Sequence, residues 1–181
     1  MPENLFGLPT HVLLQHVVVV LLPIAAAAAL LVALWTWFRQ HLGIATLVAT
    51  FIVTLFVPLT TQSGESLAGR LPESPEIAAH VAAGDRVQWV AALFGLCLFA
   101  VVALDLRRRA SMTAQLAPAE AWVSRRAPAG WRDAAPSWTS SALAVARVLL
   151  VVAAIAVIVV VVQAGHSGAS AVWSGYPNLQ P

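Results

Sequence analysis

The chain lacks lysine altogether and has few charged residues of any kind. Its 181 residues include one cysteine, and only 10% of them are charged, against about 25% in a soluble domain. The single Cys97 excludes an internal disulfide framework and any thiolate-clustered zinc or iron–sulfur site, because such sites take several sulfurs from one chain. All the basic residues are arginine, which we interpret as a compositional bias and not as a sign of nucleic-acid binding.

Hydrophobic residues make up 60% of the chain, and residues 11–38 are apolar around the whole helix circumference. A helix without a polar stripe has no face for water, so lipid is the expected solvent. Crossing the hydrocarbon core takes roughly 20 mostly apolar residues. Four segments meet this requirement: about 10–38, 42–59, 87–106 and 141–163. The sequence therefore predicts an all-α membrane protein, one domain over residues 1–181 with four transmembrane helices in a single bundle.

The positions of the arginines predict the orientation, because short arginine-rich loops stay on the cytoplasmic side. The turn after the first span and the connection after the third span contain most of them: Arg39, Arg107, Arg108, Arg109, Arg125, Arg126 and Arg132. The connection over residues 60–86 is acidic instead, with Glu65, Glu73, Glu76 and Asp85. Both termini and the acidic connection are therefore expected outside. Arg147, near the inner end of the fourth span, is expected to reach lipid phosphates.

The long inner connection, about residues 107–139, combines prolines and serines with Trp122, Trp131 and Trp138. This composition predicts an irregular segment that lies partly at the membrane interface. Its arginines can pair with anionic headgroups and its tryptophans suit the headgroup level. A docking surface for a cytoplasmic partner is the alternative.

Four of the five histidines fall on the outer side in this topology: His11, His16, His80 and His166. Ionisable residues near a bilayer are costly and usually mark a site, so these four are candidate cofactor-binding residues. His11 and His16 are five residues apart, which on a helix is about 140° of rotation. They cannot both point at one small ion.

Two kinds of cofactor fit these residues. Haem b needs one axial imidazole on each face of the macrocycle, for example His16 with His80 or with His166. A zinc or copper ion needs three or four converging ligands, which His16, His80, His166 and Glu65 can supply chemically. The alternative is that each histidine only hydrogen-bonds a helix end or a headgroup, and that no cofactor is bound.

Other chemistries have weaker support in the sequence. Ser63 and Ser167 lack the strand, sharp turn and helix that expose a nucleophilic serine. No span carries an acidic residue or a lysine near its centre, which disfavours a proton-coupled transporter. Thr46, Thr50 and Thr54 share one face of the second span, and we interpret them as a packing seam between helices.

Three stretches resemble one bacterial integral-membrane family, domain of unknown function 2231. They are residues 7–16, with the sequence GLPTHVLLQH, residues 61–84 with His80 and Gly84, and residues 165–173 around His166. The resemblance implies four spans with a polar outer layer in a bacterial cytoplasmic membrane. Related domains accompany Rieske or cytochrome-type modules, which implies electron transfer by association only.

These observations together predict an integral membrane protein that binds haem b or a transition metal and transfers electrons. Its partners would be the lipid bilayer and a redox partner or a larger membrane complex, and it would not act as an enzyme on its own. A non-catalytic accessory subunit and a metal-handling or transport protein are the alternatives.

Overall fold

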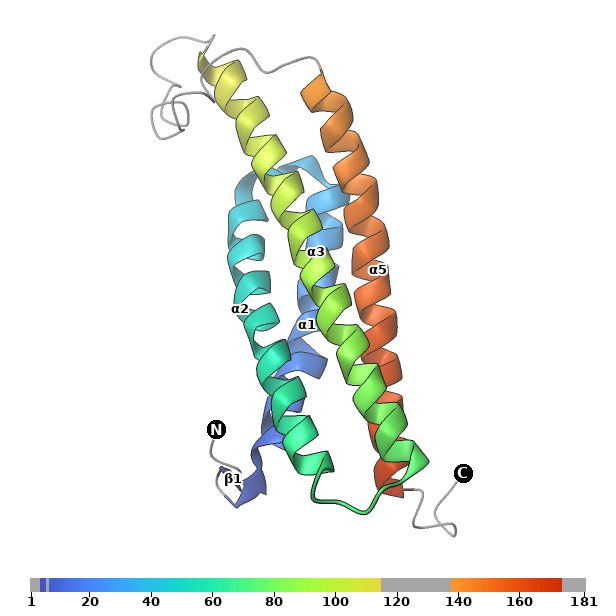
Figure 1. Ribbon diagram of the computed structural model, residues 1–181. Coiled ribbons are helices and arrows are strands. Elements are labelled where there is room, and N and C mark those ends of the chain that lie inside the picture. Colours follow the sequence, from blue (N-terminus) through green and yellow to red (C-terminus); the bar gives the residue numbers. More distant parts are fainter. Residues whose placement is uncertain (1–3, 6, 115–137, 174–181) are drawn as a thin grey trace.

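The computed structural model describes residues 4–5, 7–114 and 138–173. They form four long helices, α1 (Thr10–Leu34), α2 (Thr36–Ala68), α3 (Pro75–Ala114) and α5 (Trp138–Trp173), shown in Figure 1. All four helices are long and apolar enough to cross a membrane. Each helix is longer than the roughly 20 residues that are needed to cross the hydrocarbon core.

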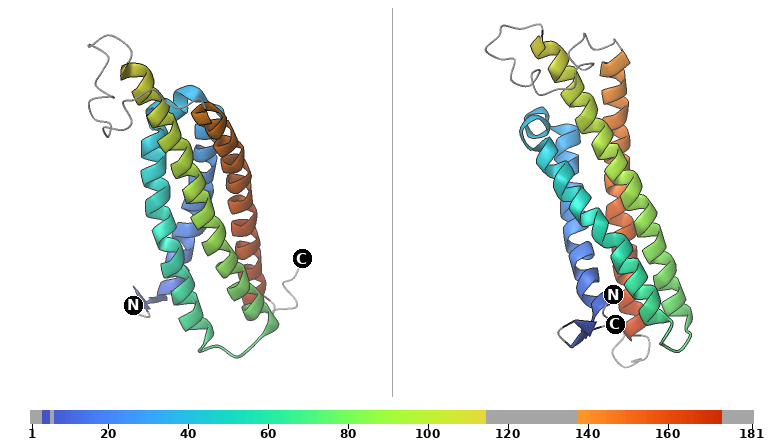
Figure 2. Two further views of the ribbon diagram at one scale, coloured as in Figure 1. Left: turned by 45° about the horizontal axis from the view of Figure 1, so that its top comes forward. Right: turned by 60° about the vertical axis from the view of Figure 1, so that its left-hand side comes forward.

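The helices pack as an up-and-down bundle. The main contacts join α1 to α2, α2 to α3, α3 to α5 and α5 back to α1, so α1 and α3 are diagonal to each other (Figures 1 and 2). We call the end where α1 and α3 begin and α2 and α5 finish the histidine end. The opposite end, with the corner between α1 and α2, is the arginine end.

A short hairpin precedes α1. Strand β1 (Asn4–Leu5) pairs antiparallel with β2 (Leu8–Pro9), and Leu5 lies opposite Leu8. Gly7, directly before β2, has φ of +79°, a backbone conformation that only glycine adopts at little cost. The hairpin leads directly into Thr10, the predicted first residue of the first helix.

The interior of the bundle is apolar and tightly packed. Its largest fully buried side chains include Leu22, Phe94, Leu98 and Leu150. Alanines such as Ala26, Ala29, Ala91 and Ala154 are also fully buried, and small residues of this kind let membrane helices approach closely.

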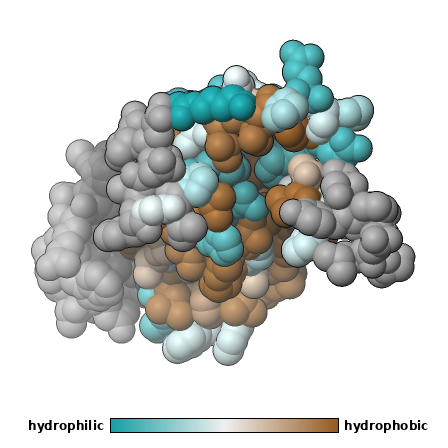
Figure 3. Space-filling model, turned by 90° about the horizontal axis from the view of Figure 1, so that it is seen from below, coloured by the Kyte–Doolittle hydropathy of each residue, from teal (hydrophilic) through white to brown (hydrophobic). Residues whose placement is uncertain are grey.

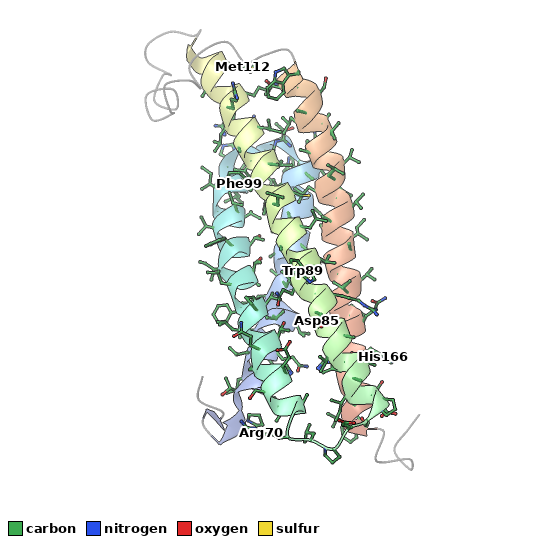
Figure 4. The ribbon with its side chains drawn as sticks, viewed as in Figure 1. Arg70, Asp85, Trp89, Phe99, Met112 and His166 are labelled. Carbon is green, nitrogen blue, oxygen red and sulfur yellow. The ribbon has the colours of Figure 1, made fainter. Side chains whose placement is uncertain are left out.

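The outer faces of the helices are apolar as well. Phe51, Leu96 and Val148 are each more than 60% exposed, as is Trp89, which Figure 4 labels on α3. A soluble bundle would place polar residues at such positions, so lipid is the solvent that this surface fits.

The described helices extend well beyond the predicted spans. Helix α2 continues to Ala68 and α3 begins at Pro75, so most of the predicted acidic connection is helical. The start of α3 has a local cause, since the Ser74 hydroxyl caps the helix by accepting a hydrogen bond from the Ile77 amide at 3.2 Å. Proline at the first helical position supports the same start.

The predicted inner connection is only partly described. Residues 107–114 continue α3, and α5 begins at Trp138, whose ring lies 5.9 Å from the Arg107 guanidinium. Trp122, Trp131, Arg125, Arg126 and Arg132 lie outside the described residues.

The structure confirms the prediction of an all-α, four-helix bundle with membrane-spanning helices. The first two predicted spans meet in a tighter corner than expected, because α1 stops at Leu34 and α2 starts at Thr36. Which end of the bundle faces out of the cell stays a prediction.

Candidate functional site

Two histidines meet inside the histidine end of the bundle. His11 lies in the first turn of α1 and His80 in the second turn of α3, so the two residues come from diagonal helices. Their ring centroids are 6.1 Å apart and the ring planes are inclined at 74°. Both side chains are partly buried. Figure 3 views this end from below and shows hydrophilic residues among hydrophobic ones.

Each imidazole is fixed by a hydrogen bond at Nδ1. The His11 Nδ1 lies 3.0 Å from the Thr60 carbonyl oxygen on α2, and a carbonyl only accepts. The His80 Nδ1 lies 3.2 Å from the Ser167 hydroxyl on α5, whose own proton is donated to the Ala164 carbonyl. Both Nδ1 atoms are therefore donors, and all four helices contribute to the arrangement.

These hydrogen bonds determine the state of the other ring nitrogen. A neutral imidazole that donates from Nδ1 has a free lone pair at Nε2. His11 and His80 thus each hold one nitrogen ready to bind a metal ion or to accept a hydrogen bond. We call these two residues the histidine pair.

Two glycines leave room for the two rings. A Cβ added to Gly64 on α2 would lie 2.8 Å from Cε1 of His11, and a Cβ added to Gly168 on α5 would lie 2.9 Å from Cε1 of His80. Real Cβ contacts are essentially never this short. The glycines therefore allow the backbones of α2 and α5 to pack directly against the imidazoles.

The histidine pair lies near one end of the predicted spans, with His80 before the third span and His11 in the first turn of the first span. Helix α3, with its 40 residues, is about 60 Å long, twice the thickness of a bilayer core. His80 precedes the predicted span by seven residues, or roughly 10 Å. Burial, together with the nearby His11, lowers the pKa of His80, whereas the Ala164 carbonyl opposes this shift. The neutral form of His80 is thus favoured.

A cavity of about 300 Å³ adjoins the histidine pair. Its polar lining consists of Gln15, Thr61 and Glu65 in addition to the two histidines. The remaining lining is mainly apolar and comes from all four helices and the connection between α2 and α3: Val12, Leu67, Leu71, Ile77, Val81 and Val172. A smaller cavity of about 60 Å³ also touches both histidines and is lined by valines such as Val18 and Val87.

The structure does not bring His16 or His166 to the histidine pair, whereas Glu65 lines the adjoining cavity. The ring of His16 is exposed, and its Nδ1 lies 2.6 Å from the Val12 carbonyl of its own helix. His166 is exposed on α5, where Figure 4 labels it. Glu65 is exposed but lines the cavity beside His11 and His80. Among the described residues, no three His, Cys, Asp or Glu side chains are grouped as a metal site would need.

Ser167 has a role that the sequence did not indicate. It was considered only as a nucleophile, a role with little support in the sequence. In the structure it orients His80, and its proton is engaged by the Ala164 carbonyl 2.9 Å away. A serine that donates to a carbonyl is not activated for attack, so the geometry also disfavours serine catalysis.

The arginine end contains a buried ion pair that the sequence analysis missed. Arg39 donates from Nε to Asp105 at 2.8 Å, and both side chains are less than 10% exposed. Arg39 also donates to the Val32 carbonyl at 3.1 Å. Asp105 gave no separate signal, because it stands at the edge of an apolar span, one residue away from three consecutive arginines.

Arg147 does not extend toward lipid phosphates as predicted. Its Nε donates to the Ala33 carbonyl at the end of α1. The last carbonyls of a helix lack partners within the helix and carry its negative dipole end, so a guanidinium is a favourable partner there.

The threonine face of α2 is consistent with a packing seam. Thr46 and Thr50 are buried and Thr54 is partly buried. The hydroxyls of Thr46 and Thr54 donate to backbone carbonyls one turn earlier in the same helix. The buried Thr50 hydroxyl has no hydrogen-bond partner within the part of the chain that the structure describes.

No known family model matches this chain, and neither a curated protein nor a solved structure matches it. The resemblance to domain of unknown function 2231 therefore stays a prediction based on the sequence motifs.

Proposed function

We propose that this integral membrane protein binds a transition-metal ion between His11 and His80 and that the ion serves electron transfer at the membrane surface. The observation that carries the proposal is the pair of Nδ1 hydrogen bonds, which leaves both Nε2 lone pairs free. Histidines that ligate metals nearly always donate their other ring N–H to a carbonyl, a carboxylate or water.

The spacing of the two rings suits a shared ion. Two metal–nitrogen bonds of about 2.0–2.1 Å, added to the ring radii, separate two ring centroids by about 6 Å when the two nitrogens lie nearly opposite each other across the ion. The observed separation is 6.1 Å. Imidazole suits copper and zinc, and of these two only copper changes its oxidation state and can carry an electron.

Further ligands are available in the cavity. Glu65 and Gln15 line it together with the histidine pair, and both offer oxygen ligands. Water can complete the coordination from the exposed side of Glu65. The exposed positions of His16 and His166 support leaving them out of the proposed coordination shell.

A bare ion fits the observed packing better than haem does. A haem group needs its macrocycle between the axial imidazoles. Gly64 and Gly168 hold α2 and α5 so close to the rings that not even a Cβ fits between them. This close packing favours a bare ion over the larger haem group.

Metal analysis of histidine variants tests the proposal. The purified protein, loaded with Cu²⁺ or Zn²⁺ and dialysed, is expected to retain about one equivalent of metal. His11→Gln and His80→Gln should lose it, whereas the exposed controls His16→Gln and His166→Gln should keep it. Visible spectra of the oxidised and reduced protein on the same samples report haem through a Soret band.

Three results would contradict the proposal. A protein that retains no metal in any form points to a structural or accessory role. Equal metal loss in the His16 and His80 variants would place the ion elsewhere. A Soret band that is present in the wild type and disappears in His80→Gln would show that the histidine pair binds haem and not a bare ion.

A further inference from the structure

The cavity beside the histidine pair is larger than an ion needs. Its volume of about 300 Å³ lies at the lower end of the range for small-molecule sites, about 300–1,000 Å³. It is lined mainly by apolar side chains, with a few polar groups at one wall. This combination is the usual composition of a site for a small organic ligand.

The polar residues that line the cavity determine which chemical groups of a ligand can be recognised. In the metal-free protein His11 and His80 present lone pairs at Nε2, because their Nδ1 protons are held by the Thr60 carbonyl and the Ser167 hydroxyl. A neutral ligand must therefore donate a hydrogen bond to be recognised. Glu65 also lines the cavity and accepts hydrogen bonds, so its polar lining favours a ligand that donates.

The position of the cavity further restricts the chemical class of the ligand. It lies near one end of the predicted spans, near the level of the headgroups. Amphipathic aromatic rings gather at this level, with the apolar body toward the membrane and the polar group toward water. A phenolic hydroxyl is more acidic than an aliphatic one, with a pKa of about 10, and is the stronger donor to an imidazole.

We propose that this cavity binds a lipid-soluble phenol or quinol whose hydroxyl donates a hydrogen bond to the histidine pair. The inference stands apart from the metal site, since it concerns the metal-free protein. A bound ion would use the same Nε2 lone pairs, so the ion and the phenol are expected to exclude each other.

Gly84 on α3 provides a variant that fills the cavity while both histidines are kept. It lines both cavities, and a Cβ added there meets no atom within 4 Å. Gly95 lies on the same helix and is equally open, but it lines neither cavity. Gly84→Leu and Gly95→Leu are therefore a matched pair, and Gly84→Ala is a milder version of the first.

The experiment measures binding of 2-naphthol and of 2-methoxynaphthalene, whose methylated oxygen cannot donate. Chelator-treated protein in lipid nanodiscs is used, with equilibrium dialysis as the readout. Wild type and Gly95→Leu should bind 2-naphthol at least tenfold more tightly than 2-methoxynaphthalene, about the effect of one buried hydrogen bond. Gly84→Leu should weaken 2-naphthol binding at least tenfold.

Equal binding of the two naphthalenes to wild type would overturn the proposal, because recognition would then not use the hydroxyl. Equal binding of 2-naphthol to the Gly84→Leu and Gly95→Leu proteins would overturn it as well. If Gly84→Leu does not fold, Gly84→Ala takes its place, and the comparison of the two ligands on wild type remains decisive. Since the protein carries no metal in this experiment, its result is separate from that of the metal analysis.

Discussion

Gly64 and Gly168 leave room for the two imidazole rings of the histidine pair because they have no side chain. A Cβ at either position would approach an imidazole to less than 3 Å, so the ring has to move. The donor atoms of a metal site must be held in position for tight binding. The two glycines are thus as much a part of the site as the ligands are.

Gly64→Ala and Gly168→Ala are each expected to weaken metal binding at least tenfold, although no ligand is removed. Gly165→Ala is the control, because a Cβ there meets nothing within 4 Å. Isothermal titration with Cu²⁺ or Zn²⁺ measures the three affinities. Equal affinities in all three variants would show that the rings tolerate the added methyl group.

The lowered pKa of His80 predicts how stability depends on pH. Below the usual histidine pKa of about 6.5, the unfolded chain binds a proton more readily than the folded protein does. The free energy of unfolding therefore falls as the pH decreases through this value and is fully retained above it.

Unfolding in detergent at pH 7.5 and at pH 5.5 measures the effect. His80→Gln should reduce the difference between the two pH values, whereas the exposed control His166→Gln should leave it unchanged. The prediction fails if His80→Gln and wild type lose the same stability at pH 5.5.

The sequence identified part of the site. Helical spacing showed that only one of His11 and His16 can face the interior, but the preferred ligand was His16. Each of the two residues has one polar and one apolar neighbour in the sequence, so hydropathy does not fix the rotation of this helix. The contact of Thr60 with His11 determines which of the two histidines faces the interior, and that contact depends on how α2 packs against α1.

At the scale of elements, the corner between α1 and α2 depends on side chains from elsewhere. The Leu31 carbonyl accepts the Trp35 amide, but the next two carbonyls have arginines as partners. Arg39 from α2 reaches Val32 and Arg147 from α5 reaches Ala33. Asp105 from α3 balances the charge of Arg39.

Asp105→Asn is expected to destabilise the bundle by about 3–5 kcal/mol, because it leaves the buried Arg39 guanidinium without its counter-charge. Asp85→Asn is the matched control on the same helix, since Asp85 is exposed and should change stability by less than about 0.5 kcal/mol. Reversible unfolding in detergent measures both. Equal stability of the two variants would show that Arg39 does not need the carboxylate.

The helix boundaries show where hydropathy stops being informative. It detects the part of a helix inside the hydrocarbon, so α3 was predicted from residue 87 although it begins at Pro75. The missing three turns carry Glu76, Asp85 and Arg86, which a hydropathy window assigns to a loop. The cap formed by Ser74 and followed by Pro75 was the local signal for the true start.

At the scale of the whole molecule, orientation is the main open prediction. The arginine distribution places the histidine end outside the cell. Starting from Cys97→Ser, single cysteines at Ser66 and at Ser140 mark the two ends, because both serines are exposed. A membrane-impermeant maleimide should label Ser66→Cys in spheroplasts and Ser140→Cys only after permeabilisation. The opposite labelling pattern would show that the orientation of the protein in the membrane is the reverse of the predicted one.

The fold class could be predicted from the composition and the length of the apolar segments alone, because an apolar segment of about 20 residues has few stable alternatives to a transmembrane helix. The order of the helices around the bundle did not follow from them. It depends on which faces carry small residues and on partners such as Arg39 and Asp105, which are distant in the sequence.

The partner of the Ala33 carbonyl stands 114 residues later in the chain. During synthesis α1 therefore enters the membrane long before Arg147 exists, and water must solvate this carbonyl until then. The first helix is held with its end at the membrane surface during this interval, since an unpaired carbonyl is costly in hydrocarbon. Insertion of α5 supplies the missing hydrogen-bond donor at the end of α1. Assembly of this bundle therefore finishes only after α5 has been made.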